Sequence, residues 1–272
     1  MRPFRFGVIG APRSGGADWL ATARRVAELG YSTLLVPDVM RMLAPGPALA
    51  AAAAVADIRV GTWVYAAPLR PPAYTAWEAH TISTLTDGRF EFGIGTGRPD
   101  AAVDAQRLGL PFGTPGERLT LVAQTLDALR ERDGAERHTP VLMAAGGPRA
   151  RSLAAELADT VSLATGPLTP HNEVVDAVAD LRARAGDRAA DIELAMNLFT
   201  AGDTAPPHIE RVLGADWATL VAHRSLSVLP GDPTAMADEL RRRREEFGFS
   251  YVLITDGYAE QLAPVVATLS GQ

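Results

Sequence analysis

Short β-rich runs alternate with amphipathic or alanine-rich helical segments along the whole chain. Runs of apolar and β-branched residues predict strands, whereas apolar positions three or four residues apart predict helices. The predicted strands cover residues 4–9, 33–36, 59–64, 90–94, 141–144, 160–163, 192–198 and 251–255. The predicted helices cover residues 19–29, 47–55, 74–85, 115–129, 149–157, 172–185, 233–247 and 260–269. The pattern therefore predicts eight strand-helix units.

Eight such units are typical of an α/β fold of the (β/α)8 TIM-barrel type, which we expect to form a single domain over residues 1–272. An open α/β sheet is the alternative. Two connections are too long for tight loops: residues 100–115 after the fourth strand, and residues 200–232 after the seventh, with an extra helix expected around residues 209–228. Both connections follow the carboxyl ends of strands, where barrels place their active sites.

The composition limits the possible partners. The 272 residues are 47% hydrophobic and 21% charged, and their net charge of -6 leaves no basic surface for nucleic acid. The longest apolar run, residues 48–56, is too short to span a membrane, and the first residues do not resemble a signal peptide. We therefore expect a cytoplasmic protein that acts on a small molecule. Without cysteine, and with five histidines that are not at ligand spacing, no metal site is expected.

In a barrel, the site is built from residues at or just after the strand ends: residues 37–39, 62–65, 95–98, 145–148, 165–166, Asn197 and 255–256. These positions hold no paired glutamates, no GxSxG elbow and no evident Ser-His-Asp set. Glycine, small hydroxyls and aromatic residues dominate instead. Such a site suits a large flat cofactor that carries the chemistry itself.

Two glycine-rich stretches follow strands: FEFGIGTGRPD at residues 90–100 and MAAGGPRARSLAAELAD at residues 143–159. In the second, a strand runs into Gly146 and Gly147, and a helix begins near Pro148 with Arg149 and Arg151 close to its start. Exposed backbone N–H groups and the positive end of a helix dipole are a basis for binding phosphate. A simple chain reversal explains the same residues, so both interpretations stay open at this point.

Five blocks together resemble the luciferase-like family of flavin- or deazaflavin-dependent oxidoreductases. In order, they are ARRVAELGYSTLLVPD (23–38), RVGTWVY (59–65), LTDGRFEFGIGTG (85–97), PVLMAAGGPRARSLAAELAD (140–159) and GDPTAMADELRRRREEFGFSYVLI (231–254). Each block is a weak signal alone, but five in the family's order and spacing cover nearly the whole chain. The resemblance implies the same (β/α)8 barrel that the strand and helix pattern predicts.

The resemblance also implies a cofactor site. Gly95, Thr96 and Gly97 would lie against the cofactor's ring and ribityl chain, and Asp38 would contact the ring edge. The cofactor's phosphate would bind at the turn formed by Ala145, Gly146, Gly147 and Pro148. A cis peptide bond between Trp63 and Val64, next to Thr62, would support the ring. The form of these blocks is closest to the branch that uses coenzyme F-420, a 5-deazaflavin, and FMN is the alternative cofactor.

The chain departs from the deazaflavin pattern at two positions. Val39 follows Asp38 where relatives usually have histidine, and Arg98 stands where alcohol-oxidising relatives often have glutamate. Without that histidine as a base, reduction of a C=N or C=C bond fits better than alcohol oxidation. The candidate catalytic residues are therefore Asp38, Trp63 and Arg98, with Arg98 facing either an anionic substrate or Asp100.

Two other functions stay open at this stage. An FMN-dependent monooxygenase served by a separate reductase would consume oxygen, which a deazaflavin reductase would not. A family member that has lost catalysis would only bind a ligand. The resemblance also implies a homodimer, because homodimers are common in the family.

Overall fold

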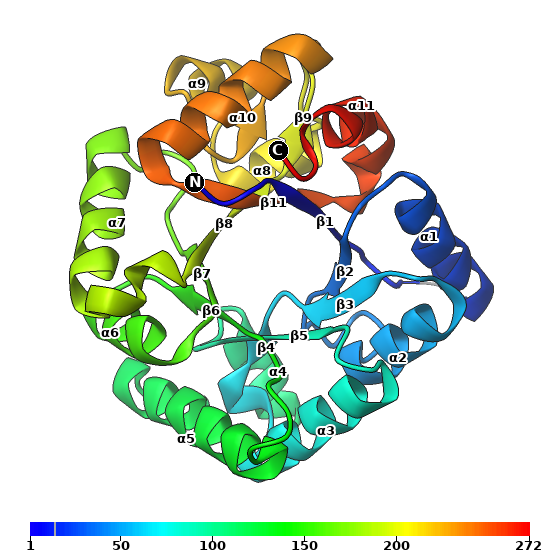
Figure 1. Cartoon of the computed structure of the whole chain (residues 1–272), viewed down its shortest axis with the longest axis vertical. Coiled ribbons are helices and arrows are strands. Elements are labelled where there is room, and N and C mark those ends of the chain that lie inside the picture. Colours follow the sequence, from blue (N-terminus) through cyan, green and yellow to red (C-terminus); the bar gives the residue numbers. More distant parts are fainter. Residues whose placement is uncertain (14) are drawn as a thin grey trace.

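The computed structural model describes residues 1–13 and 15–272, and its centre is a closed ring of eight parallel strands surrounded by helices (Figure 1). The strands pair in the order β3, β2, β1, β11, β8, β7, β6 and β5, and β5 pairs with β3 to close the ring. Their bounds are β1 (Arg5–Ile9), β2 (Thr33–Val36), β3 (Arg59–Thr62), β5 (Phe90–Gly95), β6 (Val141–Ala145), β7 (Thr160–Leu163), β8 (Glu193–Leu198) and β11 (Phe249–Thr255). The predicted TIM barrel is confirmed, and the open sheet is excluded.

A helix follows each barrel strand and packs outside the ring. These helices are α1 (Gly16–Glu28), α2 (Pro45–Val55), α3 (Pro72–Leu85), α5 (Pro115–Asp133), α6 (Pro148–Leu157), α7 (His171–Ala185), α10 (Pro233–Phe247) and α11 (Ala259–Leu269). Local signals fix several ends. The Asp232 side chain caps α10 by accepting from two backbone N–H groups at 2.9 Å, Pro233 occupies its first turn, and Gly248 ends it with φ of 92°.

The two long connections have more structure than the sequence predicted. A short helix, α4 (Ala101–Arg107), lies in the connection after β5. After β8, the segment contains two helices, α8 (Pro207–Leu213) and α9 (Trp217–Ala222), where one was predicted. Gly214, with φ of 71°, ends α8, and the Asp216 side chain caps α9, so the helical segment divides there. The strands β9 (Thr200–Ala201) and β10 (Val228–Leu229) pair at its base.

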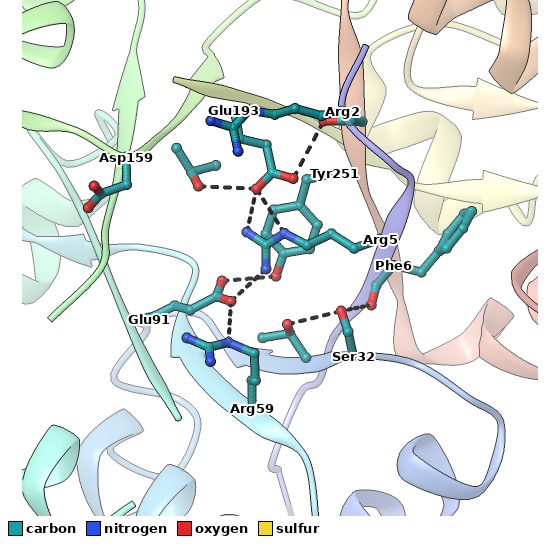
Figure 2. Close-up of polar contacts among 12 residues, drawn as sticks. Arg2, Arg5, Phe6, Ser32, Arg59, Glu91, Asp159, Glu193 and Tyr251 are labelled. Carbon is teal, nitrogen blue, oxygen red and sulfur yellow. Dashed lines mark hydrogen bonds and ion pairs between the residues drawn. The ribbon is translucent and has the colours of Figure 1, made fainter. Parts of the chain in front are cut away.

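Charged side chains fill the barrel interior at the amino-terminal ends of the strands (Figure 2). Glu91 of β5 accepts hydrogen bonds from Arg5 of β1 at 2.5 Å and from Arg59 of β3 at 2.9 Å. The Tyr251 hydroxyl of β11 donates to the second oxygen of Glu91 at 3.2 Å. Glu193 of β8 accepts from Arg5 Nε at 2.8 Å. Two carboxylates and two guanidiniums therefore close this end of the barrel with mutually compensating charges.

An apolar layer lies above these ion pairs. Its buried members are Ile9, Leu35, Leu142, Ala195, Tyr251 and Leu253, and Trp63 and Val64 pack against them. Because side chains alternate along a strand, residues 193, 195 and 197 of β8 all face the interior. The carboxyl ends of the strands therefore stand on an apolar floor. Within the described residues, no helix combines the length and the apolar character needed to cross a membrane.

Candidate active site

The third strand breaks at the position that the resemblance implied. β3 ends at Thr62, the Trp63–Val64 peptide bond is cis, and pairing with β5 resumes in β4 (Tyr65–Ala66). The strand predicted over residues 59–64 therefore ends two residues early, while the expected cis bond is confirmed. Trp63 and Val64 are half-buried on the apolar floor. Thr62 is fully buried, and its hydroxyl is satisfied there, because it donates to the Gly93 carbonyl at 2.7 Å and accepts from the Gly93 N–H at 2.9 Å.

The glycines that end β5 are explained by the chain itself. A Cβ added at Gly93 would lie 1.8 Å from the Thr62 carbonyl oxygen. At Gly95 it would lie 3.0 Å from Val64 Cγ2, and Gly97 has φ of 78°, which disfavours other residues. Packing and the turn therefore require glycine here before any ligand is considered. The segment from Gly95 to Gly97 adjoins the Trp63–Val64 bulge. Cofactor binding by Gly95, Thr96 and Gly97 stays a prediction.

The glycines in the turn from Ala145 to Pro148, unlike those that end β5, are not required by the chain itself. Gly147 is the residue before α6, it is exposed, and its φ of -78° suits any residue. An added Cβ at Gly147 would meet no atom within 4 Å, and at Gly146 it would meet only Ala164, at ordinary contact distance. Neither the backbone nor the packing of the described chain demands these two glycines. An uncrowded glycine turn at a helix start is the arrangement that lets an anion approach backbone N–H groups.

The start of α6 has free backbone N–H groups and an exposed arginine, and both suit a phosphate. The residue before the helix offers no side-chain cap, so the first-turn N–H groups are not satisfied in that way. Arg151 does not face outward from the turn. Its Nε donates to Asp180 at 2.6 Å, and its Nη1 donates to the Gly146 carbonyl, so that it holds the turn in place. Arg149 is exposed at the first turn and adds positive charge beside it.

Asp38 lies at the carboxyl end of β2 and is engaged by other residues. One oxygen accepts from the Ala66 backbone N–H at 3.1 Å, and the other accepts from Arg70 Nη2 at 2.6 Å. The Arg70 guanidinium also lies 4.1 Å from the centre of the Tyr65 ring and 3.5 Å from Glu78. Burial raises the pKa of Asp38, and the charge of Arg70 opposes that rise. Sequence reasoning missed this Arg70 contact, because 32 residues separate the pair.

Arg98 forms an ion pair with Asp100, which was the alternative to an anionic substrate. Its Nη2 and Nε donate to the two oxygens of Asp100 at 2.5 and 3.1 Å, and both side chains are exposed. The hydrogen bonds to Asp100 raise the pKa of Arg98, and the partner Arg98 lowers the pKa of Asp100. A substrate anion at Arg98 would therefore compete with a carboxylate that is already in place. The catalytic roles of Asp38, Trp63 and Arg98 stay predictions.

Asn197 is a site residue that the sequence placed at a strand end without a role. It faces the interior from the carboxyl end of β8, one level above Ala195. Its side-chain oxygen is buried and has no hydrogen-bond partner among the described residues. A buried, unpaired amide oxygen is costly unless something donates to it. The alternation of β8 was the only signal in the sequence that this amide points into the site.

Comparisons with known proteins agree with this architecture. Residues 3–218 match the family model described as luciferase-like monooxygenase. No curated protein sequence gives a significant match. An F-420-dependent secondary alcohol dehydrogenase, solved with an F-420–acetone adduct, superposes with a TM-score of 0.76 at 16% identity, covering 97% of this chain and 99% of that one.

Two further solved structures show the same fold. The coenzyme F-420-dependent tetrahydromethanopterin reductase from Methanopyrus kandleri has a TM-score of 0.74 at 16% identity, with 98% of each chain covered. The monooxygenase RslO1 from Streptomyces bottropensis has a TM-score of 0.71 at 19% identity, covering 97% of this chain and 96% of that one. At such identities the likeness concerns the fold, and it extends to proteins named as F-420-dependent and to one named as a monooxygenase.

Proposed function

The chain belongs to the luciferase-like monooxygenase family, and from that premise we propose that it binds coenzyme F-420 and reduces a C=N or C=C bond of a small organic substrate. Two of the structural neighbours are named as F-420-dependent, and each is matched over nearly its full length. When bound, the reduced deazaflavin supplies a hydride to the electrophilic carbon. The chain's own residues have to bind and orient both molecules and admit a proton.

The observation that carries the choice of reaction is the state of Asp38. Alcohol oxidation needs a base that takes the hydroxyl proton. Both Asp38 oxygens are already held, by Arg70 and by the Ala66 N–H, and Val39 replaces the histidine of relatives. Reduction of a C=N bond needs no such base, since the nitrogen that gains electron density accepts a proton from water. The engaged carboxylate therefore favours reduction.

The remaining residues have binding roles in this proposal. The open Gly146–Gly147 turn and the start of α6 hold the phosphate of the cofactor. The Trp63–Val64 bulge and the adjoining residues 95–97 support its ring on the apolar floor of the barrel. Asn197 offers an amide oxygen to an N–H or O–H group of the bound molecules. The substrate would lie between the ring and the segment that follows β8.

An FMN-dependent monooxygenase is the second candidate. The matching family model is described as luciferase-like monooxygenase, and the monooxygenase RslO1 covers nearly the same share of the chain as the F-420-dependent neighbours do. The glycine turn before α6 would hold the phosphate of FMN equally well. Because FMN reacts with oxygen and the deazaflavin does not, cofactor preference and oxygen consumption distinguish the two.

A fluorescence titration with each cofactor tests the proposal. We expect micromolar quenching with coenzyme F-420 and much weaker binding of FMN. Gly147→Asp places a carboxylate where the phosphate would bind, yet aspartate before a helix caps it well, so the fold should hold while affinity falls at least tenfold. Gly116→Asp, at an equally open glycine in the first turn of α5, is the matched control. Selective FMN binding would refute the deazaflavin assignment.

We also propose that the protein is a homodimer that pairs through α2 and α3. The helix α2 has no charged residue, and the acidic and basic side chains of α3 bond to partners within the chain: Glu78 to Tyr65 and His80 to Asp133. Tyr74, Trp77 and Leu85 are exposed by 51%, 54% and 70% on the same helix. An uncharged surface with large apolar side chains favours association. Light scattering should give twice the chain mass, and Trp77→Glu should give monomers.

A further inference from the structure

A cavity lies far from the proposed cofactor site, at the amino-terminal end of the barrel. Its volume is about 160 Å³, and its walls come from the chain start, the end of α7, the 3-10 turn η2 (Gly186–Ala190), the start of β8 and the end of α10. Residues at strand starts, such as Ile192 and Leu194, line it. A volume near 150 Å³ is enough to hold a ring the size of benzene.

The inner wall of this cavity is apolar. Leu181, Ile192 and Leu194 line it and are exposed by only 1%, 7% and 5%. Ala185 and Ala189 complete that side with small side chains that leave the space open. An apolar wall gives a bound ring or short hydrocarbon body the contacts it would lack in water.

Three arginines line the other side: Arg2, Arg182 and Arg244. Their hydrogen bonds go to main-chain oxygens: Arg2 to Asp191 at 2.5 Å, Arg182 to Phe247 at 3.3 Å, and Arg244 to the last residue, Gln272, at 2.7 Å. Among the ion pairs of residues 1–13 and 15–272, none joins these guanidiniums to an aspartate or glutamate. Their charge is therefore not neutralised by acidic side chains.

The neighbouring arginines of α10 behave differently. Arg241 pairs with Asp238 at 2.8 Å, whereas Arg242 and Arg243 pair with Glu239 at 2.6 and 2.7 Å. Arg244 is the next residue, it faces the cavity, and its Nε is buried without a hydrogen-bond partner. In a protein with a net charge of -6, a cavity bordered by three guanidiniums that have no aspartate or glutamate partner is a local concentration of positive charge.

Gly248 keeps room for one of these cations. Its φ is 92°, and a Cβ added there would lie 2.4 Å from Arg182 Nη2. Arg182 caps the end of α10 through the Phe247 carbonyl, which uses one donor of a group that has five. Helix capping therefore accounts for part of the geometry and leaves donors free for an anion.

We propose that this cavity binds a small organic anion, a monocarboxylate with an apolar body of about the size of a benzene ring. The carboxylate would receive charge-assisted hydrogen bonds from Arg182 and its two neighbours, whose planar donor pairs match two oxygens. The apolar body would lie on Leu181, Ile192 and Leu194. The site is independent of the cofactor proposal, because it lies at the opposite end of the barrel strands.

Isothermal titration of the whole protein with benzoate tests the proposal, with benzamide and inorganic phosphate as comparison ligands. Benzoate should bind one-to-one and at least tenfold more tightly than either, since benzamide lacks the charge and phosphate lacks the apolar body. Arg182→Met should weaken benzoate binding at least tenfold. Ala189→Leu keeps every charge and fills the space, so it should do the same. Arg241→Met, on the same helix with its own partner, should change nothing.

Several results would overturn the proposal. Equal binding of benzamide or of phosphate would remove the requirement for charge or for the apolar body. Unchanged benzoate affinity in both Arg182→Met and Ala189→Leu would place the ligand elsewhere, and absence of binding would exclude the site. If Arg182→Met loses its fold by circular dichroism, Ala189→Leu decides alone. These results leave the cofactor titrations unaffected, so the two proposals can fail separately.

Discussion

Replacing Glu91 with glutamine tests whether the ion pairs inside the barrel stabilise the fold. The Glu91 side chain is 5% exposed and accepts from Arg5, Arg59 and the Tyr251 hydroxyl. Glutamine keeps the shape and can still accept a hydrogen bond. The change removes one of two negative charges, so that Arg5 keeps only Glu193 and Arg59 loses its ion-pair partner.

The expected cost follows from the burial of the group. Removing one partner of a buried ion pair typically costs about 3–5 kcal/mol, because the remaining charge stays out of water without compensation. Arg5 is exposed by 26% and Arg59 by 37%, so water can reach both partly and the lower part of that range is expected. At roughly 2–4 °C per kcal/mol for a chain of this size, the melting temperature should fall by about 6–12 °C.

Guanidinium unfolding followed by circular dichroism measures this difference, together with a thermal scan. Asp100→Asn is the matched control, because it breaks an ion pair whose side chains are 75% and 61% exposed. Such a pair contributes at most about 1 kcal/mol. Cofactor affinity should be unchanged in Glu91→Gln, because the apolar layer separates this residue from the strand ends. A loss in Glu91→Gln no larger than in the control would refute the reasoning.

Three further predictions concern single positions. Asn197→Leu removes a buried oxygen without a partner, so the melting temperature should hold or rise while cofactor or substrate affinity falls about tenfold, as melting curves and titrations would show. Gly93→Ala should lower the free energy of unfolding by about 3 kcal/mol or leave the protein insoluble, because its Cβ would meet the Thr62 carbonyl at 1.8 Å. Burial alone would raise the pKa of Glu239, but the hydrogen bond from Arg242 and the charge of Arg243 hold it at about 2, below its ordinary 4.5. Its contribution to stability is therefore present above pH 4.5 and lost toward pH 2; unfolding at pH 6 and pH 3 should show Glu239→Gln losing less relative to wild type at the lower pH.

The order of strands and helices could be predicted from the sequence alone. The helix predicted over residues 233–247 has those bounds in the structure, because Asp232, Pro233 and Gly248 are local start and stop signals. Eight strand-helix units then left the barrel as the favoured arrangement, and the family blocks implied the cis bond after Thr62. The helix predicted around residues 209–228 is two helices, because Gly214 is a stop signal that the prediction did not use.

The partners of the charged and polar residues could be seen only in the folded structure. Arg5 and Glu193 are 188 residues apart and lie 2.8 Å from each other, and Arg70 reaches back to Asp38. The structure also distinguishes glycines that packing requires, such as Gly93, from Gly147, where an added Cβ would meet no atom within 4 Å. Spacing along the chain encodes which side of a strand or helix is buried. It does not encode which side chains meet, because that depends on strand register and on closure of the barrel, which brings the ends of distant strands together.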